Sequence, residues 1–204
     1  MQKYKKAISF LTILMPFAEM RPTTGYCEHF ENGIKNLDNK LFFVFLPINL
    51  AIMKATYSQR LIKLADLNHH QTFFAGRCSE YFLESSYFAV AQYVDTKDTV
   101  LLVLHGIDFK FPIFAGDIVT YESKVIAAGR STLTVYTKMY RSSEPEKIAA
   151  DGFATFSYLD ENHHSKPHGV VIEPETDEEK WLNQQAKEVL EESKQRAKAM
   201  NAAH

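Results

Sequence analysis

The stretch that decides the fold is Arg77–Tyr93, RCSEYFLESSYFAVAQY, which contains neither glycine nor proline. Its length favours a helix over a strand. Apolar residues occur around most of the circumference of such a helix, so we expect it to be largely buried. Arg77, Glu80 and Glu84 are spaced so that they share one helix face. A charged stripe on a buried helix calls for a functional explanation.

The sequence on both sides of this helix has β-strand patterns, either alternating or rich in β-forming residues. One strand, Tyr57–Leu64, is predicted before the helix. Four more follow it, with short breaks between them, as is typical of antiparallel strands; they are Thr99–Phe111, Ile118–Ala128, Ser131–Tyr140 and Lys147–Leu159. The sequence therefore predicts an α+β fold in which a curved antiparallel sheet wraps around one long central helix.

The overall composition excludes several classes of protein. The chain has 204 residues, of which 46% are hydrophobic and 24% are charged, so wholesale disorder is excluded. The net charge of −2 gives no overall basic field, and we therefore expect no nucleic-acid partner. The two cysteines, Cys27 and Cys78, are too few for a disulfide framework. No cysteine or histidine spacing matches a zinc site, so no metal is expected.

Residues 1–52 differ from the rest of the chain. Their two apolar runs, Ala7–Ala18 and Leu41–Leu50, are too short to span a bilayer, so we expect no stable membrane insertion. Lysines before the first run resemble the start of a secretory signal. A second interpretation is that the protein begins at Met53. We predict three parts: an N-terminal extension at 1–52, the main domain at 53–172 and a helical tail at 173–204.

The tail contains a predicted helix over Thr176–Met200. Asp177 can cap its N-terminus, and two glutamates follow in the first turn, where the helix dipole favours them. Trp181, Val189 and Leu190 form a narrow apolar stripe on it. Either this helix is a solvated surface helix, or its stripe is a contact between subunits.

Four segments of the main domain resemble the motifs of one known family. The first, Asp66–Gly76 (DLNHHQTFFAG), resembles the N-x-x-G-x-x-F-G-G motif that opens the central helix of the hotdog-fold acyl-CoA thioesterases. Three later segments resemble, in order, the family's V-D-F-x-x-P-V-x-x-G-D segment, its G-R-S-S hairpin turn and its F-T-F-V-A-L-D-E last strand; they are Gly106–Asp117, Gly129–Thr132 and Ala154–Glu161. The resemblance covers about residues 57–170.

This resemblance implies a single hotdog domain that hydrolyses an acyl-CoA thioester to free CoA and a carboxylic acid. It implies no metal and no other cofactor. It also implies a homodimer or a larger homo-oligomer, in which two sheets join edge to edge and acyl-CoA lies between subunits. A cytoplasmic location and a place in lipid metabolism are expected on the same basis.

The resemblance also suggests catalytic roles around the start of the central helix. The backbone N–H of Gly76 is expected to donate to the oxyanion, because amides at a helix N-terminus are free. Ala75 replaces the first glycine of the family's glycine pair but keeps the backbone donor. The family's usual catalytic acid position falls on Leu83. We therefore predict Glu84 as the general base, provided that the helix register shifts, with Glu80 as the reserve.

The loop before the helix supplies further candidates. By resemblance, the Asn68 amide is expected to orient the attacking water or to donate to the thioester carbonyl. His69 and His70 flank it, and a histidine near the thioester can act as a base near neutral pH. The alternative for at least one of them is an exposed loop histidine.

The turn at Arg130, Ser131 and Thr132 is the predicted binding site for the CoA phosphates. Arginine can hold a phosphate in a forked geometry, and the N–H groups of a turn can assist. Three histidines in a polar loop near the end of the chain are expected at the surface; they are His163, His164 and His168.

Two other functions are compatible with the same fold. A non-catalytic protein that binds acyl-CoA or an acyl carrier is favoured by Leu83, which stands at the usual acid position. A dehydratase for hydroxyacyl thioesters needs a histidine with an acidic partner. The predicted helix contains no histidine, which counts against the dehydratase.

Overall fold

The computed structural model of the protein describes residues 49–51 and 53–202. The predicted N-terminal extension lies outside the described residues, apart from β1 (Asn49–Ala51), which pairs in parallel with β7 (Val170–Ile172). Its status therefore stays a prediction. Within the described residues, no helix is both long and apolar enough to cross a membrane.

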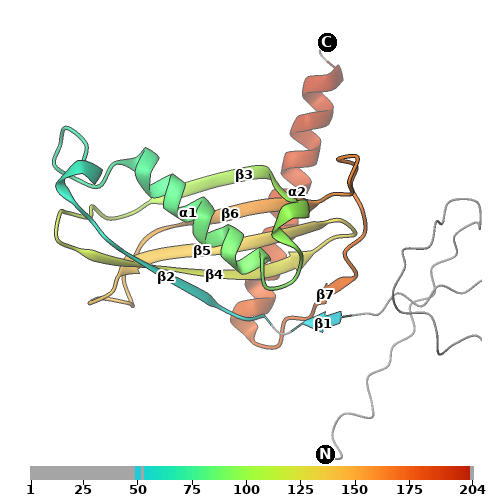
Figure 1. Ribbon diagram of the computed structural model, residues 1–204, viewed down its shortest axis with the longest axis horizontal. Helices are drawn as coiled ribbons and strands as arrows, with labels where there is room; N and C mark the ends of the chain where they lie inside the picture. Colours follow the sequence, from blue (N-terminus) through green and yellow to red (C-terminus); the bar gives the residue numbers. More distant parts are fainter. Residues whose placement is uncertain (1–48, 52, 203–204) are drawn as a thin grey trace, which may run out of the picture. The chain divides into compact units, whose positions relative to one another are not determined.

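A five-stranded antiparallel sheet forms the body of the described domain, with the strand order β2-β4-β5-β6-β3 (Figure 1). The predicted strands are all present, with ends that differ by a few residues. Their bounds are β2 (Thr56–Leu61), β3 (Thr99–Phe109), β4 (Ile118–Ala128), β5 (Thr132–Arg141) and β6 (Ile148–Tyr158). Figure 1 shows the sheet curving around one long helix, so the α+β prediction is confirmed.

That helix, α1 (Ala75–Val90), lies across one face of the sheet. Its buried side chains recur every three or four residues, as one helix face requires; they are Cys78, Phe82, Ser85, Ser86, Ala89 and Val90. The opposite face, with its charged stripe, is exposed in the single chain. The prediction of a largely buried helix therefore holds for one side of α1 only.

A chain of hydrogen-bonded hydroxyl groups joins α1 to three strands. The Ser85 hydroxyl accepts from Ser58 of β2 at 3.0 Å and from Ser123 of β4 at 3.1 Å. The Ser123 and Thr137 oxygens are 2.7 Å apart, and those of Thr137 and Ser86 are 2.8 Å apart. All except Ser58 are fully buried. Directional bonds, as well as packing, therefore fix the position of α1 on the sheet.

The opposite face of the sheet, called the outer face here, is crossed by α2 (Asp177–Ala202). Leu182 and Ala186 of α2 are buried with Ile126 of β4. The side-chain amide of Asn183 donates to the Ile126 carbonyl oxygen at 2.6 Å. Trp181 of the predicted stripe is 60% exposed in the single chain, so a contact between subunits there stays a prediction. The solvated-helix interpretation is wrong for the first half of α2, which packs on the sheet.

β3 and β6 come unusually close at a pair of glycines. A Cβ atom built on Gly152 would lie 2.2 Å from the carbonyl oxygen of Gly106 and 3.2 Å from Cα of Ile107. The β3–β6 register shifts between Leu104 and Gly106, and Gly106 has a φ of +139°. Glycine is therefore needed at 152, because a side chain there would collide with the bulged backbone of β3.

Candidate active site

The N-terminus of α1 carries unused hydrogen-bond donors. Its N-cap residue, Phe74, makes no side-chain cap, and the first amide bonded within the helix is that of Cys78, which donates to the Phe74 carbonyl at 2.9 Å. The backbone N–H groups of Ala75, Gly76 and Arg77 donate to no group in the described part of the chain, and all three residues are exposed. Such a terminus favours an anion or a developing negative charge.

The missing side chain of Gly76 leaves room for the ring of Phe74. A Cβ atom at this position would lie 2.6 Å from Cε1 of the Phe74 ring. Any side chain at 76 would therefore push the ring aside. The ring of Phe74 and the amide of Gly76 together make an apolar wall beside a free donor, which suits a thioester carbonyl.

The side chain of Asn68 is engaged within its own loop. Its oxygen accepts from the backbone N–H of His70 at 2.8 Å and from that of Thr72 at 3.3 Å, and its nitrogen donates to the Thr72 hydroxyl at 3.0 Å. These bonds shape the loop that leads into α1. The rings of His69 and His70 are exposed and lie 3.9 Å apart, centroid to centroid. The catalytic role of Asn68 and the binding roles of both histidines stay predictions.

Gln71 in the same loop has a φ of +60°, the left-handed region that favours glycine. We expect Gln71→Gly to raise the free energy of unfolding by about 1 kcal/mol and the melting temperature by about 2–4 °C. Thermal denaturation followed by circular dichroism measures both. Gln71→Ala is the control, because alanine keeps the strain; an equal gain from alanine would contradict the explanation.

The carboxylate of Glu84 pairs with a neighbouring strand. Its Oε2 lies 2.5 Å from Nη2 of Arg60 on β2. The α1 helix is continuous from Ala75 to Val90. Glu84 points about 100° away from Leu83 around the helix axis, and Leu83 packs against the core. The general-base role of Glu84 stays a prediction.

Glu80 lies nearer to the free amides. It follows Gly76 by four residues and therefore lies on the same side of α1, one turn further along. Its Oε2 is 2.6 Å from Nη1 of Arg77. The Nε of Arg77 lies 3.6 Å from Oδ1 of Asp66. Three alternating charges, Asp66, Arg77 and Glu80, thus run alongside the N-terminus of α1.

Asp66 is a site residue that the sequence analysis missed. It is only 8% exposed, its Oδ2 accepts from the backbone N–H of Lys63 at 2.9 Å, and its carbonyl accepts from that of Phe74 at 2.8 Å. It therefore braces the residue at which α1 begins. The only sequence indication was its place two residues before Asn68 in the motif.

The predicted phosphate site is a tight turn between β4 and β5. The Gly129 N–H donates to the Thr132 carbonyl at 2.7 Å. Arg130 is exposed, and its guanidinium has no hydrogen-bond or ion-pair partner among residues 53–202. The segment after β6 crosses this turn, since the His168 N–H donates to the Arg130 carbonyl at 3.3 Å. An unpaired guanidinium on a braced turn is available to a phosphate.

His168 is part of that brace, so its predicted surface position was wrong. Its Nδ1 accepts from the Val170 N–H at 3.0 Å, so its Nε2 carries the proton and donates to the Thr132 carbonyl at 3.2 Å. Burial lowers the pKa of His168, which keeps the ring neutral near pH 7. His163 and His164 are exposed, as predicted.

Lys166 places a second cation beside the turn. Its N–H donates to the Tyr158 carbonyl at 3.0 Å, and the Tyr158 N–H donates to the Ser131 carbonyl at 2.8 Å. Its Nζ lies 2.7 Å from Oδ2 of Asp98 and 4.4 Å from the centroid of the Tyr158 ring. The Asp98 carboxylate balances the charge of Lys166, which leaves Arg130 as the better phosphate ligand.

The two predicted clusters lie at opposite ends of the sheet in one chain. The loop before α1 meets the start of β4, since the Ile62 N–H donates to the Asp117 carbonyl at 2.9 Å. Arg130 follows the other end of the same strand. β4 has 11 residues, which corresponds to about 35 Å. One chain therefore does not bring its Gly76 amide and its Arg130 together.

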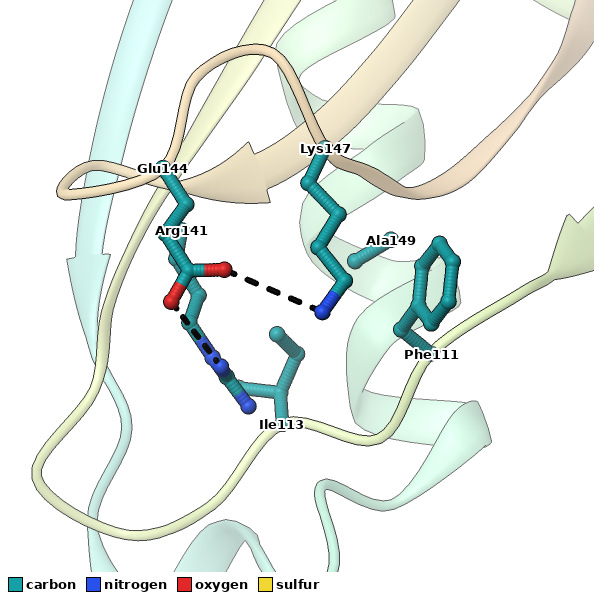
Figure 2. A pocket seen from close by; sticks show the side chains of 6 residues that line it. All are labelled: Phe111, Ile113, Arg141, Glu144, Lys147 and Ala149. Atoms are coloured by element: carbon teal, nitrogen blue, oxygen red, sulfur yellow. Dashed lines mark ion pairs between the residues drawn. The ribbon is translucent and has the colours of Figure 1, made fainter.

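Figure 2 shows a small pocket near the first of these ends, lined by Phe111, Ile113, Arg141, Glu144, Lys147 and Ala149. The Glu144 carboxylate lies between the two cations, 3.5 Å from Arg141 and 3.9 Å from Lys147. The cavity volume is about 10 Å³, room for about one water molecule and far below the roughly 300 Å³ of small-molecule sites. With its charges already paired, this pocket is a weak candidate for a ligand site.

No metal site is evident in the part of the chain that the structure describes. No group of three or more histidine, cysteine, aspartate or glutamate side chains is placed there to hold an ion. Cys78 is buried beside Met139 and Tyr121, and burial raises the pKa of its thiol to about 11. It is therefore unsuited to act as a nucleophile.

Comparison with known proteins shows clear relatives. Residues 70–148 match the model of the thioesterase superfamily. A curated relative from Bacillus subtilis (strain 168), named as the uncharacterized acyl-CoA thioester hydrolase YkhA, is 31% identical over 152 residues, which cover 73% of this chain and 87% of the relative.

Two solved structures extend the comparison. An acyl-CoA hydrolase from Staphylococcus aureus, solved with butyryl coenzyme A, coenzyme A and coenzyme A disulfide, is 27% identical and has a TM-score of 0.66; the match covers 76% of this chain and 96% of that one. A hexameric acyl-CoA thioesterase, solved without ligand, is 28% identical with a TM-score of 0.63, over 70% of this chain and 92% of that one.

Proposed function

Because this chain belongs to the acyl-CoA thioester hydrolases of the thioesterase superfamily and has their hotdog fold, we propose that it hydrolyses an acyl-CoA thioester to free CoA and a carboxylic acid. The observation that carries the proposal is the 31% identity across 87% of the curated relative. The uncapped N-terminus of α1 supports it, because thioester hydrolysis needs donors for an oxyanion.

In the proposed mechanism, the thioester carbonyl accepts a hydrogen bond from the Gly76 N–H. The Glu80 carboxylate accepts a proton from a water molecule, whose oxygen attacks the carbonyl carbon. The C–S bond then breaks, and the proton passes to the CoA sulfur. Arg77 holds Glu80 in place, and Asp66 holds Arg77.

We propose that two chains complete the site. β3 pairs with β6 along one side only, and its other edge is free in the described chain. This strand exposes apolar side chains suited to an interface, at Val100, Leu101, Leu102 and Leu104. If two β3 edges pair antiparallel, the α1 N-terminus of one chain comes next to the Arg130 end of the other. This homodimer, or a larger homo-oligomer built from it, would bring the Gly76 amide of one chain next to the Arg130 turn of the other.

The test is thiol release from a panel of acyl-CoAs that range from short to long chains. The proposal predicts turnover well above the rate of spontaneous hydrolysis for at least one of them. Absence of thiol release across the panel, with acyl-CoA binding retained in calorimetry, would instead support a non-catalytic acyl-CoA binding protein. Leu83 at the family's usual acid position is the observation that favours this second candidate.

Arg130→Gln should raise KM for acyl-CoA by about 10-fold or more while kcat stays nearly constant, because a charge-assisted bond to phosphate is worth roughly 1.5–3 kcal/mol. Steady-state kinetics measure both constants. An acyl-pantetheine substrate lacks the nucleotide phosphates, so wild type and variant should then have equal KM. Lys187→Gln is the control, since Lys187 is an exposed lysine on α2. An unchanged KM for acyl-CoA would remove Arg130 from the site.

A further inference from the structure

The second half of α2 leaves the sheet that supports the first half. Its inward stripe, Leu182, Ala186, Val189, Leu190 and Ser193, is buried or half-buried. Every described residue after Ser193 is exposed. Figure 1 shows the helix crossing behind the sheet and continuing beyond β3, the edge strand.

His105 lies in the bulge of β3, and its Nε2 is 2.8 Å from the Thr155 hydroxyl on the outer face. Burial and, less strongly, the positive charge of Arg196 lower the pKa of His105, so Arg196 lies within electrostatic range of β3. The residues after Arg196, called the overhang here (residues 197–202), therefore extend past the edge of the sheet.

The overhang continues the inward stripe of α2, but the sheet of its own chain no longer lies beneath it. Ala197 and Met200 follow Ser193 at spacings of four and three, which keeps them on the inward face. Met200 is 61% exposed. Short helical segments are marginal in water without tertiary packing, so an ordered overhang calls for a partner surface.

We propose that the overhang docks on a second copy of this chain, over the outer face of the strand that pairs with the free edge of β3. The inference rests on the edge-to-edge assembly of the proposed function. Any strand that extends the sheet at β3 must lie directly beneath the overhang, because α2 leaves the sheet across that edge. In a two-fold dimer each chain supplies one overhang and receives the other.

Apolar side chains favour a second copy as the occupant. The edge of β3 that no strand of the described chain covers belongs to a strand with exposed apolar residues, namely Val100, Leu101, Leu102 and Leu104. A second copy that pairs with this edge brings the same apolar strand beneath Ala197 and Met200.

Photo-cross-linking of the full chain tests the contact directly. With p-benzoylphenylalanine at Met200, irradiation should give covalent dimers whose cross-linked peptides map to β3, β6 or α2 of the other copy. The same group at Lys187, an exposed position over the chain's own sheet, should give none. Cross-links only within one chain, or only to copies that do not share the β3 edge, would overturn the proposal.

A charge-matched pair of double variants tests its energetic contribution. Ala197→Glu with Met200→Glu adds two negative charges on the inward face, and should raise the dimer dissociation constant at least 10-fold in analytical ultracentrifugation. Gln195→Glu with Ala202→Glu adds the same charge on the opposite face and should leave the constant unchanged. Circular dichroism checks that both remain folded.

The outcomes separate the two proposals. If the wild-type chain is a dimer and both double variants dimerise equally well, the overhang contact is wrong and the proposed function stands. If the wild-type chain does not assemble, the proposed two-chain site fails and the overhang contact fails with it. Hydrolysis at protein concentrations far above the dissociation constant should be the same in both variants.

Discussion

Replacing Glu80 with glutamine is expected to lower kcat for acyl-CoA hydrolysis by at least about 100-fold, the usual contribution of a general base. Glutamine keeps the size and the hydrogen-bonding oxygen of the side chain but does not accept a proton from water. KM should change little, because substrate binding rests on other groups. Stopped-time assays of thiol release with a saturating acyl-CoA measure the loss.

Glu84→Gln is the matched control for this prediction. Both glutamates lie on α1, both are exposed, and each forms one ion pair with an arginine. Loss of the exposed pair with Arg60 is expected to change kcat by less than about threefold, because such pairs contribute little. The reverse result, with Glu84→Gln inactive and Glu80→Gln active, would restore the base predicted from the sequence. It would also imply that the carboxylate of one chain serves the other chain's Gly76.

Gly152→Ala is expected to destabilise the domain by about 3 kcal/mol, at the upper end of the cost of overpacking. The new Cβ would lie 2.2 Å from the Gly106 carbonyl oxygen, and a backbone atom cannot rotate away as a side chain can. β3 would have to move away from β6. Urea denaturation measures the change in the free energy of unfolding.

Gly106→Ala separates this clash from backbone strain. A Cβ atom at Gly106 meets nothing within 4 Å, so only its φ of +139° opposes alanine. Its expected cost is about 1–2 kcal/mol. If Gly106→Ala lowered the free energy of unfolding as much or more, backbone strain and not the clash would be the reason for glycine where β3 and β6 approach each other. Because β3 is the proposed dimer edge, Gly152→Ala should also weaken assembly.

The fold was predictable because its periodic patterns are long and its elements are consecutive along the chain. The run without glycine or proline predicted α1, and alternation predicted β4 and β5 within a few residues. The packing of α2 on the sheet was not predicted, because the residues that the sheet buries, Leu182 and Ala186, lie outside the predicted stripe.

The candidate site was less predictable, because its contacts are formed by tertiary structure. His168 was predicted to be a surface histidine in a loop. The segment after β6 instead places its ring within hydrogen-bond distance of the Thr132 carbonyl oxygen. Asp66 lay inside the motif, but only the fold places it against Arg77. The separation of Gly76 from Arg130 along β4 also depends on strand direction, which a motif does not encode.

The buried hydroxyl chain between α1 and the sheet has a consequence for the evolution of this sequence. Every buried oxygen in it has two partners, because Ser85 also bonds Ser58 and Ser86 also donates to the Phe82 carbonyl oxygen at 2.8 Å. Removing one hydroxyl therefore leaves each buried neighbour with one bond. The expected cost is that of a lost bond, about 0.5–1.5 kcal/mol, and not that of an unsatisfied buried group. The chain can thus lose its hydroxyls one substitution at a time, with each intermediate still folded.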